Sequence, residues 1–317
     1  MELPNVTPAE PTLAALPNPV LRYLMATRPA FLSVSVFAAL IGIAAAYYGG
    51  VTVSPMTATV SLLFALVVHA AVNVLNDYYD DLNGTDRVNT ERLFPFTGGS
   101  RFIQNGVMSS RAMLQFGLAL LGATVLAGLW LMSVSGPGLL WIGVAGCFIG
   151  WAYSGTPFKL NSRGLGEPCV ALGFGLIAIG TDYVQRKAFA ALPAFAVASY
   201  ALLVTNILYI NQFPDRRADE AAGKRHWVVR LGVRAAPWGY AVIGLAAYLW
   251  VIGAVLAGAL PKPALASLAT LPMTLGAARQ LFAHAGEPAK LAPGIKQSIA
   301  AANANGLLMA AALAYSR

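Results

Sequence analysis

The sequence predicts an all-α membrane protein, a polytopic bundle of about nine transmembrane helices around a central cavity. Of its 317 residues, 57% are hydrophobic and only 11% are charged, and the mean hydropathy is +0.64. A soluble domain carries about 25% charged residues. Apolar runs close to the roughly 20 residues that cross a bilayer as a helix recur along the chain. The runs are continuous rather than alternating, which favours helices over a barrel.

We expect residues 1–28 to be a disordered or interfacial N-terminus and residues 29–317 to be one intramembrane domain. The chain is polar and proline-rich up to about Pro19, a composition typical of disorder, and Pro19–Arg28 has an apolar side that suits a lipid surface. The predicted spans are Pro29–Tyr48, Pro55–Asn76, Arg111–Val134, Leu139–Tyr153, Leu165–Asp182, Leu192–Gln212, Ala235–Leu260, Leu265–Ala283 and Ile295–Tyr315. The fourth is short, and Pro272 interrupts the eighth.

Lys and Arg residues are unevenly distributed between the segments that join these spans. With the N-terminus in the cytoplasm, all but four of the 21 lie in cytoplasmic segments. Because positive residues favour the cytoplasmic side, we expect a multi-pass protein of the cell (inner) membrane, embedded in the lipid bilayer, with its active site facing the cytoplasm. The net charge of +8 then reflects membrane topology rather than nucleic-acid binding. The four exceptions are Arg186, Lys187, Lys262 and Arg317.

Two acidic stretches end apolar spans on this cytoplasmic side. In each, Asn and Asp recur about every four residues, so that they share one helix face. Like charges at that spacing repel unless a cation neutralises them, and carboxylates together with substrate phosphates are typical ligands of Mg²⁺. We expect the two stretches to face each other and to hold a magnesium diphosphate. The residues concerned are Asn73, Asp77 and either Asp80 or Asp81 in the first stretch, and Asn211, Asp215 and Asp219 in the second.

Cations accompany both stretches. Lys224 and Arg225 follow the second, and Arg101 follows Gly98-Gly99-Ser100 after the first. Such cations can bind diphosphate oxygens, and glycine backbone N–H groups can approach an anion closely. Simple solvation at the membrane interface would account for one acidic helix end, but not for two with matched spacing. The pattern therefore predicts binding of an isoprenoid diphosphate whose apolar tail lies in the membrane.

The two stretches resemble the motifs of a known family. Asn76-Asp77-x-x-Asp80-x-x-x-Gly84-x-Asp86 and Asp215-x-x-x-Asp219-x-x-x-Gly223-Lys224 are similar to the two motifs of the UbiA superfamily of intramembrane aromatic prenyltransferases. Three further segments resemble its 1,4-dihydroxy-2-naphthoate polyprenyltransferase branch, which acts in menaquinone biosynthesis. They are Gly84-x-Asp86, Thr97-Gly-Gly-Ser-Arg101, and Tyr153-Ser-Gly-Thr-Pro157 leading to Arg163-Gly-Leu-Gly-Glu167.

The resemblance implies an Mg²⁺-dependent transferase that moves a polyprenyl group from polyprenyl diphosphate to an aromatic acceptor. That acceptor would be 1,4-dihydroxy-2-naphthoate, attacked at its carboxylated carbon with loss of CO₂. We expect catalytic and metal-binding roles for Asp77, Asp80, Asp215 and Asp219, with Asp81 as a further metal ligand. The expected substrate-binding residues are Asn73, Asn76, Arg101, Tyr153, Lys159, Asn211, Lys224 and Arg225.

Some features depart from the family pattern or leave alternatives open. Pro214 precedes Asp215 and is expected to kink or end the sixth span, and His226-Trp227 stands where a Thr-Leu-like pair is expected. His69 is interpreted as a packed histidine, with a role at the acceptor as the alternative. The same fold acting on another quinone precursor or a lipid is one alternative function. A cation transporter is another, but it predicts carboxylates near mid-span.

Overall fold

The computed structural model describes residues 9–317, and that part of the chain is built from helices without a strand. Residues 1–8, the start of the predicted disordered N-terminus, lie outside the described residues. The 3₁₀ helices are η1 (Leu160–Arg163), η2 (Lys262–Thr270) and η3 (Pro288–Lys290). The α-helices are α1 (Pro19–Ala26), α2 (Pro29–Tyr48), α3 (Pro55–Asn83), α4 (Thr85–Val88), α5 (Ser110–Ser135), α6 (Gly138–Ser154), α7 (Gly166–Arg186), α8 (Leu192–Ala221), α9 (Trp227–Leu256), α10 (Leu271–His284) and α11 (Ala292–Tyr315).

The predicted all-α membrane bundle is confirmed, and a helix lies at each predicted span. Seven helices are long and apolar enough to cross a membrane, namely α2, α3, α5, α7, α8, α9 and α11. The fourth span is the shorter apolar helix α6. The eighth is divided into η2 and α10, with Pro272 in the first turn of α10, a position that tolerates a missing backbone N–H.

Two helices extend well beyond the spans that hydrophobicity marks out. The third helix, α3, continues past Asn76 to Asn83, and α8 continues past Gln212 to Ala221. The acidic stretches are therefore the last turns of these helices. Helix α3 ends where Gly84 adopts a φ of +79°, a left-handed conformation that glycine provides at helix C-termini. Pro214 does not end α8, because the helix continues through it for two further turns.

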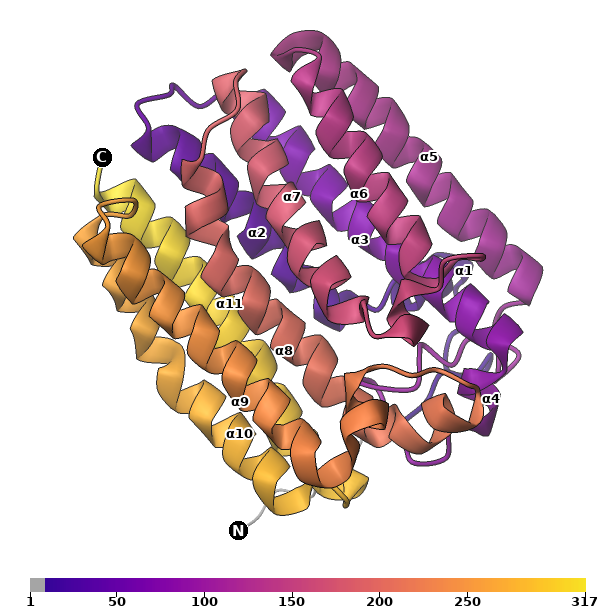
Figure 1. Cartoon of the computed structure of the whole chain (residues 1–317). Coiled ribbons are helices and arrows are strands. Elements are labelled where there is room, and N and C mark those ends of the chain that lie inside the picture. The colour runs from indigo at the N-terminus through magenta and orange to yellow at the C-terminus, as the bar shows by residue number, and fades with distance from the viewer. Residues whose placement is uncertain (1–8) are drawn as a thin grey trace.

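The helices lie side by side around α8, which is largely buried in the bundle (Figure 1). Helices α5 and α6 form one edge of the bundle, and α9, α10 and α11 form the other. Helix α8 contacts α2, α7, α9 and α11. Helix α2 contacts α3 and α7 as well as α8 and α11. The buried Tyr200 of α8 donates a hydrogen bond to the carbonyl of Val34 in α2 at 2.6 Å.

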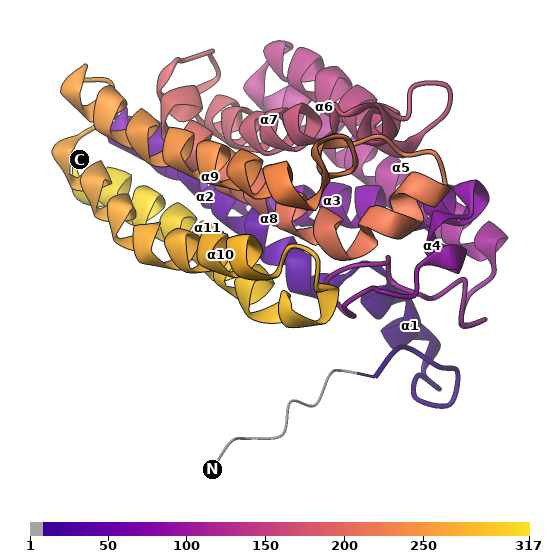
Figure 2. The same cartoon turned by 60° about the horizontal axis from the view of Figure 1, so that its bottom comes forward.

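Small residues allow the helices to approach closely, as is common in membrane bundles. A Cβ at Gly42 of α2 would lie 2.0 Å from the carbonyl oxygen of Ala178 in α7. A Cβ at Gly239 of α9 would lie 2.1 Å from the hydroxyl of Tyr209 in α8. These contacts hold α2 against α7 and α8 against α9. Helix α9 is broken at Gly232, so its first turn is set off from the long part of the helix (Figures 1 and 2). Trp227 in that turn donates to the carbonyl of Gly164, after η1, at 2.7 Å.

Candidate active site

Lys224 joins the ends of α3 and α8. Its ammonium nitrogen lies 2.8 Å from Oδ1 of Asp80 and 3.2 Å from Oδ1 of Asp219. Burial alone would lower the pKa of Lys224, but the carboxylates of Asp219 and Asp80 outweigh that effect and raise it well above its usual value. The side chain is therefore a cation between the two acidic stretches, and those stretches face each other as the sequence predicts.

The carboxylates of α8 are held by donors from other elements. Asn89, at the end of α4, donates to Oδ1 of Asp215 at 2.6 Å, and the backbone N–H of Gly98 donates to Oδ2 at 3.1 Å. Nε2 of His226 lies 3.0 Å from the second carboxylate oxygen of Asp219, whose first oxygen faces Lys224. All four oxygens of this pair thus have a protein partner.

The carboxylates on the α3 side are less fully engaged. The backbone N–H of Ser100 donates to Oδ2 of Asp77 at 3.1 Å. Oδ1 of Asp77 and Oδ2 of Asp86 are both buried and have no hydrogen-bond partner within residues 9–317. Burial, together with the charges of Asp80 and Asp77, raises the pKa of Asp86 well above its usual value. An additional cation at this point would stabilise the ionised carboxylates.

Gly99 lies against both of these free oxygens. A Cβ at this position would lie 2.6 Å from Oδ2 of Asp86 and 3.1 Å from Oδ1 of Asp77, and the residue has a φ of +72°. Glycine meets both requirements, since it lacks a Cβ and adopts positive φ without strain. The loop that carries Gly98, Gly99 and Ser100 therefore closes over the carboxylates with its backbone.

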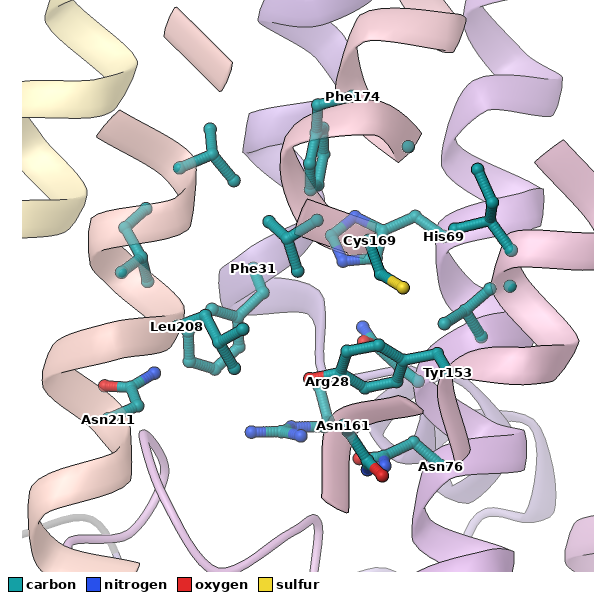
Figure 3. Close-up of a pocket in the computed structure, with 18 of the residues that line it drawn as sticks. Arg28, Phe31, His69, Asn76, Tyr153, Asn161, Cys169, Phe174, Leu208 and Asn211 are labelled. Carbon is teal, nitrogen blue, oxygen red and sulfur yellow. The ribbon is translucent and has the colours of Figure 1, made fainter. Parts of the chain in front are cut away.

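The carboxylates of Asp80, Asp86, Asp215 and Asp219 form an acidic rim. A cavity of about 420 Å³ leads from this rim into the bundle (Figure 3). Near the rim it is lined by polar side chains, namely Asn73, Asn76, Tyr153, Asn161, Asn211 and Gln212. Its inner part is lined mainly by apolar residues, among them Val68, Val72, Ile149, Phe174, Ile177 and Leu208, and by glycines of α6 and α7. A polar mouth over an apolar interior suits a ligand with a charged head and an apolar tail.

Five of the predicted site residues do not line this cavity. Asp77 lies directly behind the lining, with its unpartnered oxygen beside Gly99. Asp81 faces another side of α3 and accepts a hydrogen bond from Arg87 at 3.1 Å. Consecutive residues point in different directions on a helix, so Asp80 and Asp81 cannot both face α8. Arg101 donates to the backbone oxygen of Asp86, Lys159 donates to Asn83 at 2.7 Å, and Arg225 is exposed.

Several residues at the rim were not predicted as site residues. Asp86, Asn89 and His226 line the cavity beside the predicted aspartates. In the sequence, Asp86 stands out only as part of the family pattern and His226 only as a departure from it, and Asn89 carries no local signal. Its contact with Asp215 joins two residues that are distant in the chain, and helical spacing does not detect contacts of this kind.

The region that contains this site matches a known protein family. A model described as the UbiA prenyltransferase family matches residues 35–292. The chain belongs to the UbiA prenyltransferase family. It is accordingly a prenyltransferase, and its apolar helices make it a multi-pass membrane protein. The matched region runs from α2 to the start of α11 and includes both acidic stretches and the loop over them.

Curated proteins are similar to this chain over most of its length. A 1,4-dihydroxy-2-naphthoate octaprenyltransferase of Bacillus subtilis is 29% identical over 74% of this chain and 73% of its own. A 2-carboxy-1,4-naphthoquinone phytyltransferase of Synechocystis is 29% identical over 84% and 82%. Among solved structures, a UbiA homolog from Archaeoglobus fulgidus bound to DMAPP and Mg²⁺ has a TM-score of 0.61 at 18% identity. The match covers 92% of this chain and 99% of the homolog.

Proposed function

We propose that this protein transfers a polyprenyl group from polyprenyl diphosphate to 1,4-dihydroxy-2-naphthoate, with loss of CO₂, in menaquinone biosynthesis. The central observation is that two acidic helix ends meet at the mouth of a cavity with an apolar interior. A diphosphate would lie at the rim and the polyprenyl tail in the interior. The naphthoate acceptor is supported by similarity to relatives that are named for related two-ring substrates.

The donor atoms at the rim fit Mg²⁺. Asp77 and Asp86 each present a buried carboxylate oxygen without a partner in the described chain, and Asp80, Asp215 and Asp219 lie beside them. No three acidic, His or Cys side chains between residues 9 and 317 converge as a complete metal site. Mg²⁺ is commonly bound by one or two carboxylates plus substrate phosphates, so a complete protein cage is not required. When bound, the ion would withdraw charge from the diphosphate as a Lewis acid.

The chain's own residues would then bind and orient the donor. Lys224 would release Asp80 or Asp219 and turn to a diphosphate oxygen as a charged donor. Asn73, Asn76 and Asn211 would orient the head group and the first isoprene unit. The allylic C–O bond breaks, the diphosphate leaves, and the carboxylated carbon of the acceptor forms the new C–C bond before CO₂ is lost. The apolar wall of the cavity would keep water from the allylic cation.

We place the acidic rim on the cytoplasmic side of the inner membrane. The Lys and Arg distribution supports this orientation, since positive loops favour the cytoplasm. Asp81, Arg101 and Lys159 are left out of the proposed substrate site because they lie outside the cavity lining and have other partners, and Arg225 is left out because it is exposed. Asp77 also lies outside the lining, but it is kept as a metal ligand because its buried, unpartnered oxygen lies with that of Asp86 at Gly99. In this proposal Arg101 supports the loop over the rim from behind, through the backbone oxygen of Asp86.

Purified protein in nanodiscs can be incubated with Mg²⁺, a labelled polyprenyl diphosphate and a panel of acceptors. We expect a prenylated naphthoquinol product and CO₂ release with 1,4-dihydroxy-2-naphthoate, and no product when EDTA is present. Turnover of 4-hydroxybenzoate or of a lipid alcohol, with none of the naphthoate, would contradict the proposed acceptor.

A further inference from the structure

His69 lies in the inner wall of the cavity, away from the acidic rim. It belongs to α3, two helical turns, or about 12 Å along the axis, before Asp77. Its Nδ1 lies 2.8 Å from the hydroxyl of Ser35, a fully buried residue of α2. Its ring packs edge-on against Phe174 of α7, with centroids 5.5 Å apart. Contacts from two neighbouring helices therefore hold the imidazole.

The second ring nitrogen of His69 is available to a ligand. Nε2 has no hydrogen-bond partner in the described part of the chain, and the side chain lines the cavity. Figure 3 shows the imidazole projecting from α3 into the space between Phe174, Cys169 and Phe31. A polar atom in an apolar enclosure is costly unless it is hydrogen-bonded. The apolar tail of an isoprenoid cannot supply that bond.

Two other polar or titratable groups face His69, and neither is hydrogen-bonded to its Nε2. Arg28, at the N-terminus of α2, lies between His69 and the rim, and Cys169 faces it from α7 (Figure 3). Arg28 is a permanent cation, and it donates to the backbone oxygen of Phe96. When Nδ1 of His69 donates to Ser35, Nε2 carries the lone pair, because the partner of one ring nitrogen determines the state of the other.

We infer that His69, oriented by Ser35, binds a hydroxyl of the aromatic acceptor and accepts its proton during prenyl transfer. This inference rests on the proposed function. In the step, the acceptor O–H bond breaks and the proton moves to Nε2. The electron pair that is released enters the ring, whose carbon bonds to the allylic carbon as the bond to diphosphate breaks. His69 is a catalytic residue in this scheme, and Ser35 is a positioning residue.

Three variants test the assignment in the purified membrane enzyme: His69→Gln, Ser35→Ala and the control His284→Gln. His284 is a histidine far from the cavity, paired with Glu287 on the surface. General-base catalysis contributes about 10²- to 10⁴-fold, so we expect His69→Gln to lower kcat with the naphthoate by about 100-fold or more. We expect a loss of roughly tenfold for Ser35→Ala, as for a residue that orients a catalytic group, and none for His284→Gln. Binding of the labelled donor should stay within about twofold in all three.

Acceptors that carry a methoxy group in place of each hydroxyl in turn separate catalysis from a structural role. With the hydroxyl that His69 binds blocked, wild type and His69→Gln should react at the same low rate. Three outcomes would contradict the inference. His69→Gln could lower kcat by the same factor with every acceptor, it could lose donor binding in parallel with turnover, or its turnover could be unchanged. If wild type transfers the prenyl group to no hydroxylated aromatic, the proposed function itself fails. Transfer that His69→Gln retains in full overturns the inference alone.

Discussion

The two acidic helix ends share one sequence pattern but differ in how the fold uses them. On α8, Asp215 and Asp219 have a protein partner for each carboxylate oxygen. On the α3 side, Asp77 and the adjacent Asp86 each retain a buried oxygen without a partner among the described residues. Like charges repel at both helix ends. The difference in hydrogen bonding arises because Asn89, Gly98 and Lys224 contact the carboxylates of α8.

This asymmetry indicates a division of labour at the rim. The α8 carboxylates are already oriented before any ligand binds, whereas the α3 side has oxygens that can accept a metal or another donor. A site with one fixed wall loses less conformational freedom when its ligand binds. The following substitutions test this division, beginning with the side that carries the free oxygens.

Asp77→Asn should have the largest effect. It removes a charge and a free carboxylate oxygen from the proposed metal site, and loss of several kcal/mol of metal-assisted stabilisation corresponds to about 10³-fold in rate. Prenyl transfer measured at saturating Mg²⁺ checks this. The matched control is Asp81→Asn, on the same helix but paired with Arg87 away from the cavity. Equal losses in the two variants would remove the distinction between these neighbouring aspartates.

Lys224→Met should reduce both activity and stability. It leaves Asp80 and Asp219 without their cation, and removing one partner of a buried pair costs about 3–5 kcal/mol. The raised pKa of Lys224 means that its stabilisation is fully present below the usual lysine pKa of about 10.4 and declines only above it. The fall in melting temperature should therefore be similar from pH 6 to pH 9. Arg225→Met, at the adjacent exposed position, should leave the melting temperature unchanged.

Gly99→Ala should lower transfer activity by about tenfold or more. The added methyl group would meet the free oxygens of Asp86 and Asp77 and displace the loop. Gly106→Ala is a close control, because Gly106 lies in the same loop with a similar φ of +68° but has open space around it. Both variants bear the strain of a positive φ, about 1 kcal/mol. If the two lose activity equally, strain alone explains the effect and the contact with the carboxylates does not matter.

Glu10→Gln should have the smallest effect, a few-fold decrease in activity. Glu10 accepts a hydrogen bond from Arg92 at 2.7 Å, and Arg92 donates to the backbone oxygen of Asn89, which holds Asp215. Burial raises the pKa of Glu10, but hydrogen bonds from Asn105 and Arg92 outweigh that effect and lower it. The difference from wild type should thus be present at neutral pH and disappear as the pH falls through that lowered value.

The control for Glu10→Gln is Glu91→Gln. Glu91 pairs with Arg217 at 2.6 Å on the surface of the same loop region, and exposed pairs contribute little. Transfer activity across a pH series compares the two variants. An equal, pH-independent loss in both would show that Glu10 has no particular connection to the rim.

The sequence predicts the helices well because the bilayer imposes a length and an apolar composition on each span. Pro29–Tyr48 is predicted to the residue. The apolar spans stop short of the ends of α3 and α8 because hydrophobicity stops where the charged turns begin, and the helical spacing of Asn and Asp is what predicts the continuation. Backbone hydrogen bonding continues past that point, and Pro214 interrupts it less than expected because the packed helix tolerates one missing donor.

The aspartates were identifiable by their spacing, whereas their partners were not. Asn89, Gly98 and Ser100 reach the carboxylates from a loop without regular structure, and such contacts follow no periodic pattern. Arg101 lies in the same loop. The sequence predicts that it contacts the diphosphate, but in the structure its side chain donates to the backbone oxygen of Asp86 behind the rim. The sequence indicates a packed histidine at His69, and its contacts with Ser35 and Phe174 agree. That His69 also borders the cavity depends on the rotation of α3, which sequence spacing does not show.

By itself, the sequence determined a helical membrane protein with two matched acidic helix ends, because bilayer thickness and helical periodicity act on every residue locally. Only the tertiary structure decided which side of α3 faces α8. That rotation directs Asp80 toward Lys224 and Asp81 toward Arg87. It also decided that Asp77 and Asp86 retain free oxygens while Asp215 and Asp219 do not. These outcomes depend on contacts between segments far apart in the chain, which a local pattern cannot encode.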